Sequence, residues 1–396
     1  MQSIIIRFFA GIVSAGVLAV CPSASASEST STADVGIGEY GEEAESIHQR
    51  RFQDLLAAFA AGEGTTRYDT LAELKGADAF IPLARAGAKT IPSEALNRAI
   101  EYAGARRSAA LMVYRHGVVE EAHYYGETTP QTLIKSKSLA KPLGVVAIGR
   151  AIKIGAIDSL DQPVSDFIRE WRNTDKQNIL VRHLLDMRSG LLRQGFSPEM
   201  NHILNRAYLH PYHDDVIINH YPLTDPPGER YEYSNATSEL VGPLIERATG
   251  VEYETFLEEQ VLAPLGAQGG SIWMNREGGA AHSGCCVQLP ADSWLRLAVL
   301  VLNDGVWDGE ALLPDGFATE MKTPTALNPH AGMGLFLGSP YKEWRGVGNP
   351  ENDFSQSFHS EPYVDEDLLL FDGNGNQVAY IVPSEDLVIM RLGETP

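Results

Sequence analysis

Each end of this chain carries two strand-like segments joined by a tight turn, and this arrangement constrains the fold more than any other feature. Near the amino end, apolar residues 109–114 lead through a His-Gly turn to a second segment at 118–125. Near the carboxyl end, segments 377–382 and 387–392 flank a turn that begins with proline. Helical patterns dominate between the two pairs. We therefore expect an α+β fold, with an antiparallel sheet built from both ends, flanking helices and an inserted, mainly helical subdomain.

Residues 1–26 predict a secretory signal peptide. Arg7 is their only charged residue, an apolar stretch follows it, and Ala24-Ser25-Ala26 is a small-residue cleavage site. Lipidation of Cys21 is the weaker alternative, because the residue before it is valine. Export would place the mature protein in the periplasm or outside the cell, without a stable membrane anchor.

The rest of the chain divides into a lead-in, an extension and one main domain. The lead-in is rich in Ser, Thr, Glu and Gly, a composition typical of disorder. The expected boundaries are 27–47 for the disordered lead-in, 48–92 for a helical extension and 93–396 for the main domain, whose sheet is expected from 93–135 and 290–396 and whose helical insert from about 150–290.

The formal net charge of −21 disfavours nucleic acid and anionic membranes as partners, because both repel an acidic surface. It does not identify a substrate. Once the signal peptide is removed, the remaining cysteines are Cys285 and Cys286. Adjacent cysteines rarely bridge each other, since the small ring strains the peptide between them. We therefore expect two buried thiols instead of a disulfide.

The motif that carries chemistry is Ser138-Leu139-Ala140-Lys141, at the start of an apolar helical pattern. Side chains three residues apart on a helix share one face, so the two polar groups can share a proton. Serine needs a neighbouring base to act as a nucleophile, and burial of a lysine disfavours its charged form and makes it a base. The free N–H groups at a helix start also stabilise an oxyanion. The motif predicts a covalent serine hydrolase without a histidine triad.

The spacing of serine and lysine is not specific by itself. The motif taken alone also fits an ordinary helix cap followed by a surface lysine. The chain contains a second match, Ser339-Pro340-Tyr341-Lys342, where proline follows the serine and no apolar helix comes after. We expect that second segment to be a surface loop.

Tyr233-Ser234-Asn235 follows a rigid Pro-Pro-Gly turn. A tyrosine near a lysine cation can have a lowered pKa and pass a proton to a leaving group. The amide of Asn235 can hold either a substrate carbonyl or the lysine. For the triplet alone, a core tyrosine beside a loop asparagine is the alternative.

Histidines and aspartates gather between residues 202 and 220, which raises the question of a metal site. Imidazole suits zinc, but helical His spacing is absent and Pro211 interrupts any helix. We expect a polar, aromatic loop over a cleft, with no metal and no cofactor. The residues concerned are His202, His210, His213, His220, Asp214 and Asp215.

Together these motifs resemble the serine β-lactamase and penicillin-binding-protein superfamily, and within it the class C-like branch of esterases and 6-aminohexanoate-oligomer hydrolases. The resemblance extends from about Ser93 to Gly393. The matching stretches, in family order, are 138–142, 157–164, 181–191, 227–235 and 303–309.

The resemblance implies a role for each residue of the motifs. Ser138 corresponds to the acylated nucleophile, Lys141 to its proton acceptor and Tyr233 to the acid/base for the leaving group. The family's third motif, Lys/His-x-Gly, matches the region of 371–377.

At that third motif, Gly373 would allow close approach of substrate to the strand. The N–H of Asn374, with that of Ser138, would form the oxyanion hole. In related hydrolases the loop corresponding to 192–230 shapes the substrate pocket, so Tyr212 and Asp215 are expected substrate contacts.

The third motif departs from the family pattern in a way that bears on the substrate. Phe371 and Asp372 stand where β-lactamases and peptidases have a cation that holds the substrate carboxylate. This departure argues against β-lactam and D-Ala-D-Ala substrates and favours a neutral ester or a simple amide. Arg345 or Arg391 is the alternative source of a cation.

The leading hypothesis is an exported serine hydrolase that cleaves a small ester or amide through an acyl-enzyme on Ser138. The first alternative is a DD-peptidase or β-lactamase that acts on peptidoglycan-type or β-lactam substrates. The second is a non-catalytic binding module with the same fold.

Overall fold

The structure is a computed structural model that describes residues 39–61, 67–85, 87–193, 195–346, 348–351 and 356–394. The predicted signal peptide and most of the predicted lead-in lie outside these ranges. Within them, no helix is both long and apolar enough to cross a membrane.

The described helices and strands alternate along the chain as follows. The helices are α2 (Glu42–Ala60), α3 (Ser93–Gly104), α4 (Ala140–Lys153), α5 (Val181–Leu185), α6 (Ile203–Leu209), α7 (His213–His220), α8 (Asn235–Glu239), α9 (Val241–Thr249), α10 (Tyr253–Leu257), α11 (Ala263–Leu265), α12 (Ala291–Leu302) and α13 (Phe317–Lys322). The strands are β1 (Leu71–Leu74), β2 (Ser108–Arg115), β3 (Val118–Tyr124), β4 (Ile134–Lys135), β5 (Gly270–Trp273), β6 (Val287–Leu289), β7 (Val306–Trp307), β8 (Glu310–Ala311), β9 (Phe336–Leu337), β10 (Trp344–Gly346), β11 (Gln356–Phe358), β12 (Leu369–Gly373), β13 (Gln377–Val382) and β14 (Leu387–Gly393).

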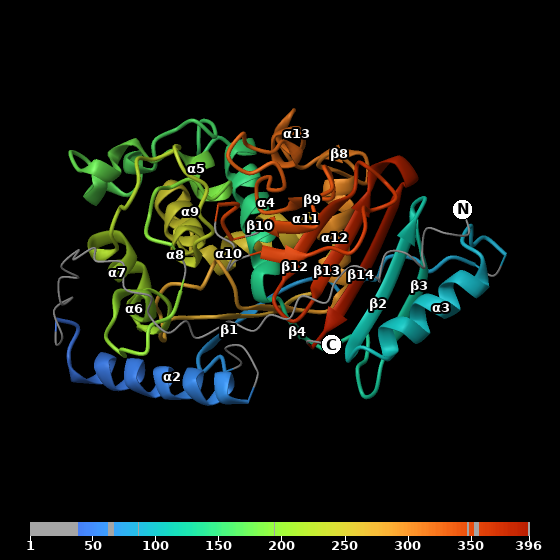
Figure 1. The fold of residues 1–396 in the computed structure, drawn as a ribbon, viewed down its shortest axis with the longest axis horizontal. Helices are drawn as coiled ribbons and strands as arrows, with labels where there is room; N and C mark the ends of the chain where they lie inside the picture. The colour runs from blue at the N-terminus through green and yellow to red at the C-terminus, as the bar shows by residue number, and fades with distance from the viewer. Residues whose placement is uncertain are drawn as a thin grey trace.

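The main sheet joins the two ends of the chain, as the strand patterns predicted. Its six antiparallel strands follow the order β3-β2-β14-β13-β12-β9. The central pairing is between β14 and β2, with Ile389 opposite Val113. Figure 1 shows this sheet on the side of the molecule where the C-terminus lies, with the inserted helices on the other side. The predicted α+β class is confirmed.

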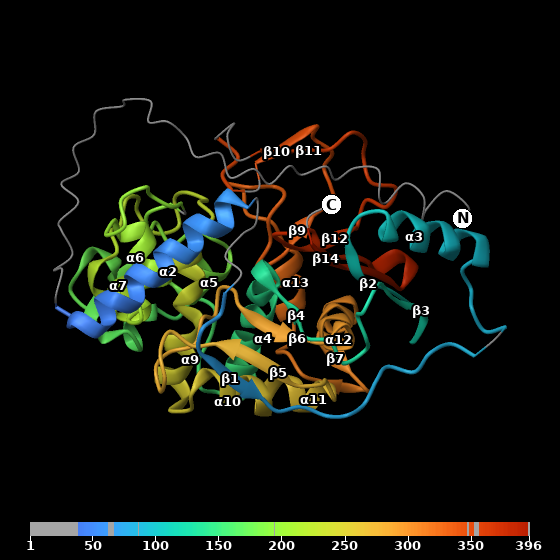
Figure 2. The same ribbon diagram turned by 90° about the horizontal axis from the view of Figure 1, so that it is seen from below.

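Helices cover both faces of the sheet because successive strand residues point to opposite faces. On β14, Leu387 and Ile389 pack with Leu96 and its neighbours on α3. Val388 and Met390 belong to the larger core that contains α4 and α12. In Figure 2, α3 and α12 lie on opposite sides of the sheet. This second core fixes α4, which carries the serine-lysine motif.

The predicted helical extension and the mainly helical insert also contribute short strands. Strand β1 from the extension and strands β5 and β6 from the insert form a second sheet with β4, in the order β1-β5-β6-β4. These strands have between two and four residues, too few for a clear alternating pattern.

Two predictions about irregular segments also need correction. Residues 42–47, assigned to the disordered lead-in, form the beginning of α2, where three glutamates in the first turn favour the helix N-terminus. The stretch 192–230, expected to be a loop, contains α6 and α7, separated at Pro211.

The prediction of two free thiols is also wrong. Cys285 and Cys286 are joined by a disulfide between adjacent residues. The backbone of Cys286 is left-handed, with φ of 77°. Both residues are buried against Trp273 and Tyr208.

Helix α2 is attached to the insert by a buried ion pair. The guanidinium of Arg206 on α6 is fully buried, and its two terminal nitrogens donate to the carboxylate of Glu45 at 2.8 and 2.7 Å. The Nε2 atom of His210 lies 3.6 Å from the same carboxylate. Figure 2 shows α2 lying across α6. The extension is therefore part of the folded domain.

We predict that Glu45→Ala lowers the free energy of unfolding by about 3 kcal/mol, because it leaves the buried guanidinium of Arg206 without its counter-ion. Urea unfolding followed by circular dichroism measures this change. Glu43→Ala is the matched control, since Glu43 is exposed on the same helical turn. Equal stability of the two variants would contradict the anchoring role of α2.

Candidate active site

Ser138 lies at the junction between the second sheet and helix α4. It is the middle residue of a short 3-10 turn, η1 (Lys137–Leu139), that runs directly into α4. Ser136, the residue before η1, pairs with Val287 of β6 through two hydrogen bonds, of 2.8 and 3.1 Å. Lys137 has a left-handed backbone, with φ of 50°, and the side chain of Leu139 is fully buried. The sheet and the core thus fix the serine from both sides.

Lys141 follows one turn later, and its side chain is only 7% exposed. Its Nζ lies 3.3 Å from Ser138 Oγ, 2.8 Å from Asn235 Oδ1 and 2.9 Å from the carbonyl oxygen of Gly284. An ammonium group has three N–H donors, and these three acceptors match them. The same arrangement holds a neutral amine within reach of the serine proton.

Tyr233 completes the group. Its hydroxyl lies 2.9 Å from Ser138 Oγ, and its ring centroid is 4.8 Å from Lys141 Nζ. Its backbone N–H donates to the carbonyl of Gly348 at 2.8 Å, which fixes the residue just before helix α8. The structure therefore brings Ser138, Lys141, Tyr233 and Asn235 together, although Lys141 and Asn235 are 94 residues apart in the sequence and Ser138 and Tyr233 are 95 apart.

The third motif also lies at the serine. Strand β12 ends at Gly373, where a Cβ atom would come within 2.9 Å of the carbonyl oxygen of Ser136. Only glycine lets the strand approach the serine turn this closely. Asn374 follows in the exposed turn, where its Oδ1 accepts from the N–H of Gly375 at 2.9 Å. Its part in an oxyanion hole stays a prediction.

Arg391 and Arg345, the two alternative cations for a substrate carboxylate, are both committed to carbonyl groups of the protein. Arg391 donates to the carbonyls of Gly375 and Asn376 at 2.7 and 2.9 Å and so braces the turn after β12. Arg345 is buried and donates to the carbonyl of Gly338 at 2.6 Å. Both guanidinium groups are buried and held by these hydrogen bonds.

Tyr212 and Asp215 lie beside the N-terminal segment. The ring of Tyr212 stacks on Tyr40 with centroids 5.2 Å apart, and the guanidinium of Arg276 lies 3.9 Å from the Tyr212 ring centroid. Asp215 accepts from the hydroxyl of Tyr40 at 2.6 Å. These contacts give both residues a structural task, and their contact with substrate stays a prediction.

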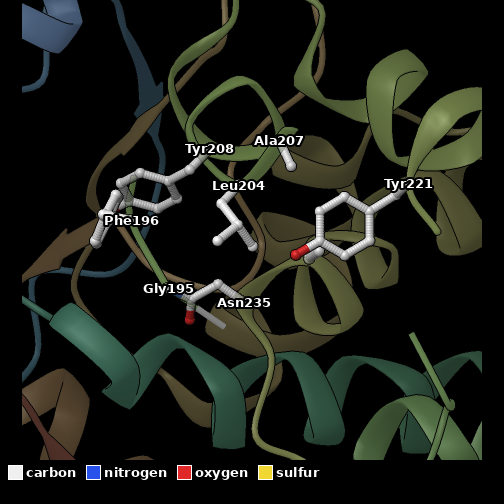
Figure 3. Close-up of a pocket in the computed structure, with 8 residues that line it drawn as sticks. Gly195, Phe196, Leu204, Ala207, Tyr208, Tyr221 and Asn235 are labelled. Carbon is white, nitrogen blue, oxygen red and sulfur yellow. The ribbon is translucent and has the colours of Figure 1, made fainter. Parts of the chain in front are cut away.

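A pocket opens beside Asn235 (Figure 3). In Figure 3 the rings of Phe196 and Tyr208 form one side, Tyr221 forms the opposite side, and Asn235 lies below them. Its lining residues carry no formal charge and are mostly apolar: Gly195, Phe196, Leu204, Ala207, Tyr208, Tyr221, Asn235 and Ala236. The space is about that of one water molecule, so the pocket marks an uncharged wall beside Asn235 and not a complete substrate site.

The four histidines considered as zinc ligands do not gather around one point. His202 accepts from the N–H of Leu204, whereas His210 and His220 lie near Glu45 and Glu39. His213 instead joins two residues that the sequence did not single out, Glu239 and His282. In the described part of the chain, this is the one group of three or more His, Cys, Asp or Glu whose potential ligand atoms lie within 4.8 Å of one another.

The antiparallel sheet with its helical insert, and the serine-lysine pair at the head of α4, define the class of serine β-lactamases and penicillin-binding proteins. The comparisons agree with this class. The Beta-lactamase family model matches residues 96–393, and the chain belongs to this family.

Relatives within the family have several activities. The chain is 30% identical over 112 residues to a monacolin J acid methylbutanoyltransferase from Aspergillus terreus, a match that covers 28% of this chain and 26% of the relative. It is 29% identical over 147 residues to esterase EstB from Burkholderia gladioli, covering 34% of this chain and 37% of the esterase. The matches thus span well under half of either relative.

Among solved structures, a proposed 6-aminohexanoate-dimer hydrolase from Bacillus anthracis superposes with a TM-score of 0.62. The superposition covers 87% of this chain and 88% of that structure, at 18% sequence identity. At this identity the likeness supports the fold alone.

We predict that Lys141→Met lowers ester turnover about 10³-fold, because it removes the proton acceptor beside Ser138, and that Tyr233→Phe lowers it about 10²-fold. Hydrolysis of p-nitrophenyl butyrate measures both effects. Lys153→Met, at an exposed position near the end of the same helix, is the matched control. Turnover by the Lys141→Met variant at the wild-type rate would contradict the assignment of the base.

Proposed function

We propose that this protein is a serine hydrolase that cleaves a small, neutral ester or amide through an acyl-enzyme on Ser138. The observation that carries the proposal is the position of Ser138 Oγ, 3.3 Å from Lys141 Nζ and 2.9 Å from the hydroxyl of Tyr233. A protein that only binds a ligand does not need a serine, a lysine and a tyrosine brought together in this way.

In the acylation step, Lys141 accepts the proton of Ser138 as Oγ attacks the substrate carbonyl carbon. The backbone N–H groups of Ser138 and Asn374 stabilise the negative charge on the carbonyl oxygen. Tyr233 then donates its hydroxyl proton to the leaving alcohol or amine, and the bond to that group breaks. Water attacks the resulting ester of Ser138 by the reverse proton transfers and releases the acid.

Three features support a neutral substrate over a β-lactam or a peptidoglycan stem peptide. The third motif carries an exposed aspartate, Asp372, in place of a cation. Arg345 and Arg391 are held by backbone carbonyls. The pocket beside Asn235 has an uncharged lining. A carboxylate-bearing substrate would find no partner among these groups.

We further propose that the protein is exported, with cleavage after Ala26. The support is the apolar stretch and small-residue site within 1–26. Mass spectrometry of the protein recovered from the periplasm or medium tests this: a mature chain that begins at Ser27 is expected, and a cell-bound lipid adduct on Cys21 would contradict it.

To test the hydrolase proposal, the mature protein is treated with a fluorophosphonate and analysed by intact-mass spectrometry and peptide mapping. We expect one adduct, on Ser138, together with hydrolysis of p-nitrophenyl butyrate; Ser138→Ala should lose both and keep its fold. Ser339→Ala, which removes the serine of the second S-x-x-K match, is the matched control and should behave as wild type.

A folded Ser138→Ala variant with normal ester turnover would exclude this mechanism. A stable adduct with labelled penicillin would favour the peptidase or β-lactamase alternative. A folded wild-type protein with no adduct and no turnover would favour the binding-module alternative.

A further inference from the structure

Behind the active site, one buried carboxylate lies between two imidazole rings, within ion-pair distance of each and without a hydrogen bond to either. Glu239 is the last residue of α8, His213 is the first residue of α7, and His282 lies between β5 and β6; all three are 0% exposed. Nε2 of His213 lies 3.5 Å from Oε2 of Glu239, and Nδ1 of His282 lies 3.5 Å from Oε1. Each ring thus faces a different oxygen of one carboxylate. We call these three residues the Glu239 clamp.

The ring geometry does not favour a metal ion in the clamp. The rings of His213 and His282 stack face to face, with centroids 4.0 Å apart and planes 8° apart. A metal ion binds the in-plane lone pair of a ring nitrogen, at about 2.0–2.1 Å for zinc. The lone pairs of two stacked rings lie in two parallel planes, so they do not converge on one ion between the rings. Trp273, stacked on the other face of His282 at 4.0 Å, holds this orientation.

The clamp instead suits an ionised carboxylate that faces two N–H groups. A fully buried carboxylate is costly unless polar groups compensate it. Burial alone would raise the pKa of Glu239, but the facing imidazoles of His282 and His213 lower it overall. Burial lowers the pKa of His282 to about 4, so this ring faces the carboxylate as a neutral group near pH 7.

Other titratable groups around the clamp leave this arrangement unchanged. Burial raises the pKa of Tyr68 and of Tyr253, and the negative charge of Glu239 raises both further. Arg51 lies beyond Trp273, 5.0 Å from its ring centroid, and lowers the pKa of His282 further. Cys285, whose Sγ lies 3.9 Å from Glu239 Oε1, is in the disulfide.

The clamp connects the two segments that hold the amine of Lys141. Helix α8 begins at Asn235 and ends at Glu239, and His282 precedes Gly284 by two residues. Asn235 Oδ1 and the Gly284 carbonyl are the two closer acceptors of Lys141, at 2.8 and 2.9 Å.

The two segments are also packed tightly against each other. The hydroxyl of Ser283 donates to the carbonyl of Ser238 at 2.8 Å. A Cβ atom on Gly284 would come within 3.0 Å of Glu239 Oε1. The Glu239 carboxylate therefore lies close against the backbone whose carbonyl accepts from Lys141.

We infer that Glu239 is a positioning residue: its contact with His282 fixes the Gly284 carbonyl relative to the Asn235 amide, and so holds the amine of Lys141 at Ser138. This inference rests on the proposed acyl-enzyme function. It assigns different tasks to two equally buried histidines. His282 lies in the segment that contacts Lys141, whereas His213 holds the other carboxylate oxygen from α7, which does not contact the lysine.

The experiment compares Glu239→Gln, His282→Leu and His213→Leu in the full mature protein. We expect the first two to lower kcat for p-nitrophenyl butyrate at least about tenfold, with KM nearly unchanged, because misplacement of the base affects the chemical step. The acid limb of the kcat–pH profile should shift in both. His213→Leu should lose stability but keep kcat within about twofold of wild type.

Two further variants separate positioning from stability. His282→Asn keeps an N–H donor near the position of Nδ1 and should recover most of the kcat that His282→Leu loses. Asp292→Asn breaks another buried pair, with Arg296, and should lower the melting temperature without changing kcat. If Glu239→Gln does not fold, the kcat values of His282→Leu, His282→Asn and His213→Leu decide whether the clamp positions Lys141.

If the wild-type protein is active, two results would overturn this inference alone. One is an equal loss of kcat in His282→Leu and His213→Leu. The other is a Glu239→Gln variant that keeps the wild-type kcat and pH profile. A melting temperature that rises with added zinc, and no longer does so in His282→Leu, would replace it with a metal site. Wild-type protein without fluorophosphonate labelling or ester turnover would overturn the proposed function and this inference with it.

Discussion

The architecture of the site depends on one requirement: the buried ammonium that forms when Lys141 accepts the proton of Ser138 must have a hydrogen-bond partner for each of its three protons. The partners come from the serine turn, the start of α8 and the carbonyl of Gly284, which lies 143 residues beyond the lysine. An unpaired buried ammonium costs several kcal/mol. Sheet, insert and connecting segments therefore have to meet at this point, and distant elements such as the Glu239 clamp become relevant to chemistry at Ser138.

The large-scale fold and the main reacting groups were predictable because their signals are local. The two hairpins have regular alternation and turn residues, and the structure places β2, β3, β13 and β14 at the predicted segments. Ser138 and Lys141 occupy helical spacing, so their proximity follows from the motif itself. The meeting of Tyr233 with them is long-range, and only the combined motif pattern predicted it.

The features that the sequence did not reveal lack a local signal. Strand β4 has two residues, and β1 gains its partner β5 from a segment about 200 residues away. The acceptor at Gly284 is a backbone carbonyl, which any residue type supplies. The histidines between 202 and 220 suggested a cluster by their spacing, but only tertiary structure showed that His213 faces Glu239 and His282 instead.

The N-terminal extension takes part in the same network because it braces the wall of the pocket. Helix α6 presents Arg206 to Glu45 of α2 and presents Leu204, Ala207 and Tyr208 to the pocket beside Asn235. Helix α7, which carries His213 of the clamp, is bound to the segment just before α2 through Asp215 and Tyr40. Helix α6 has only 7 residues, about two turns, so it has little stability of its own and depends on these tertiary contacts. The shape of the pocket is therefore a property of the extension and the hydrolase-like domain together, and a chain cut before residue 93 would lose the support on which that wall relies.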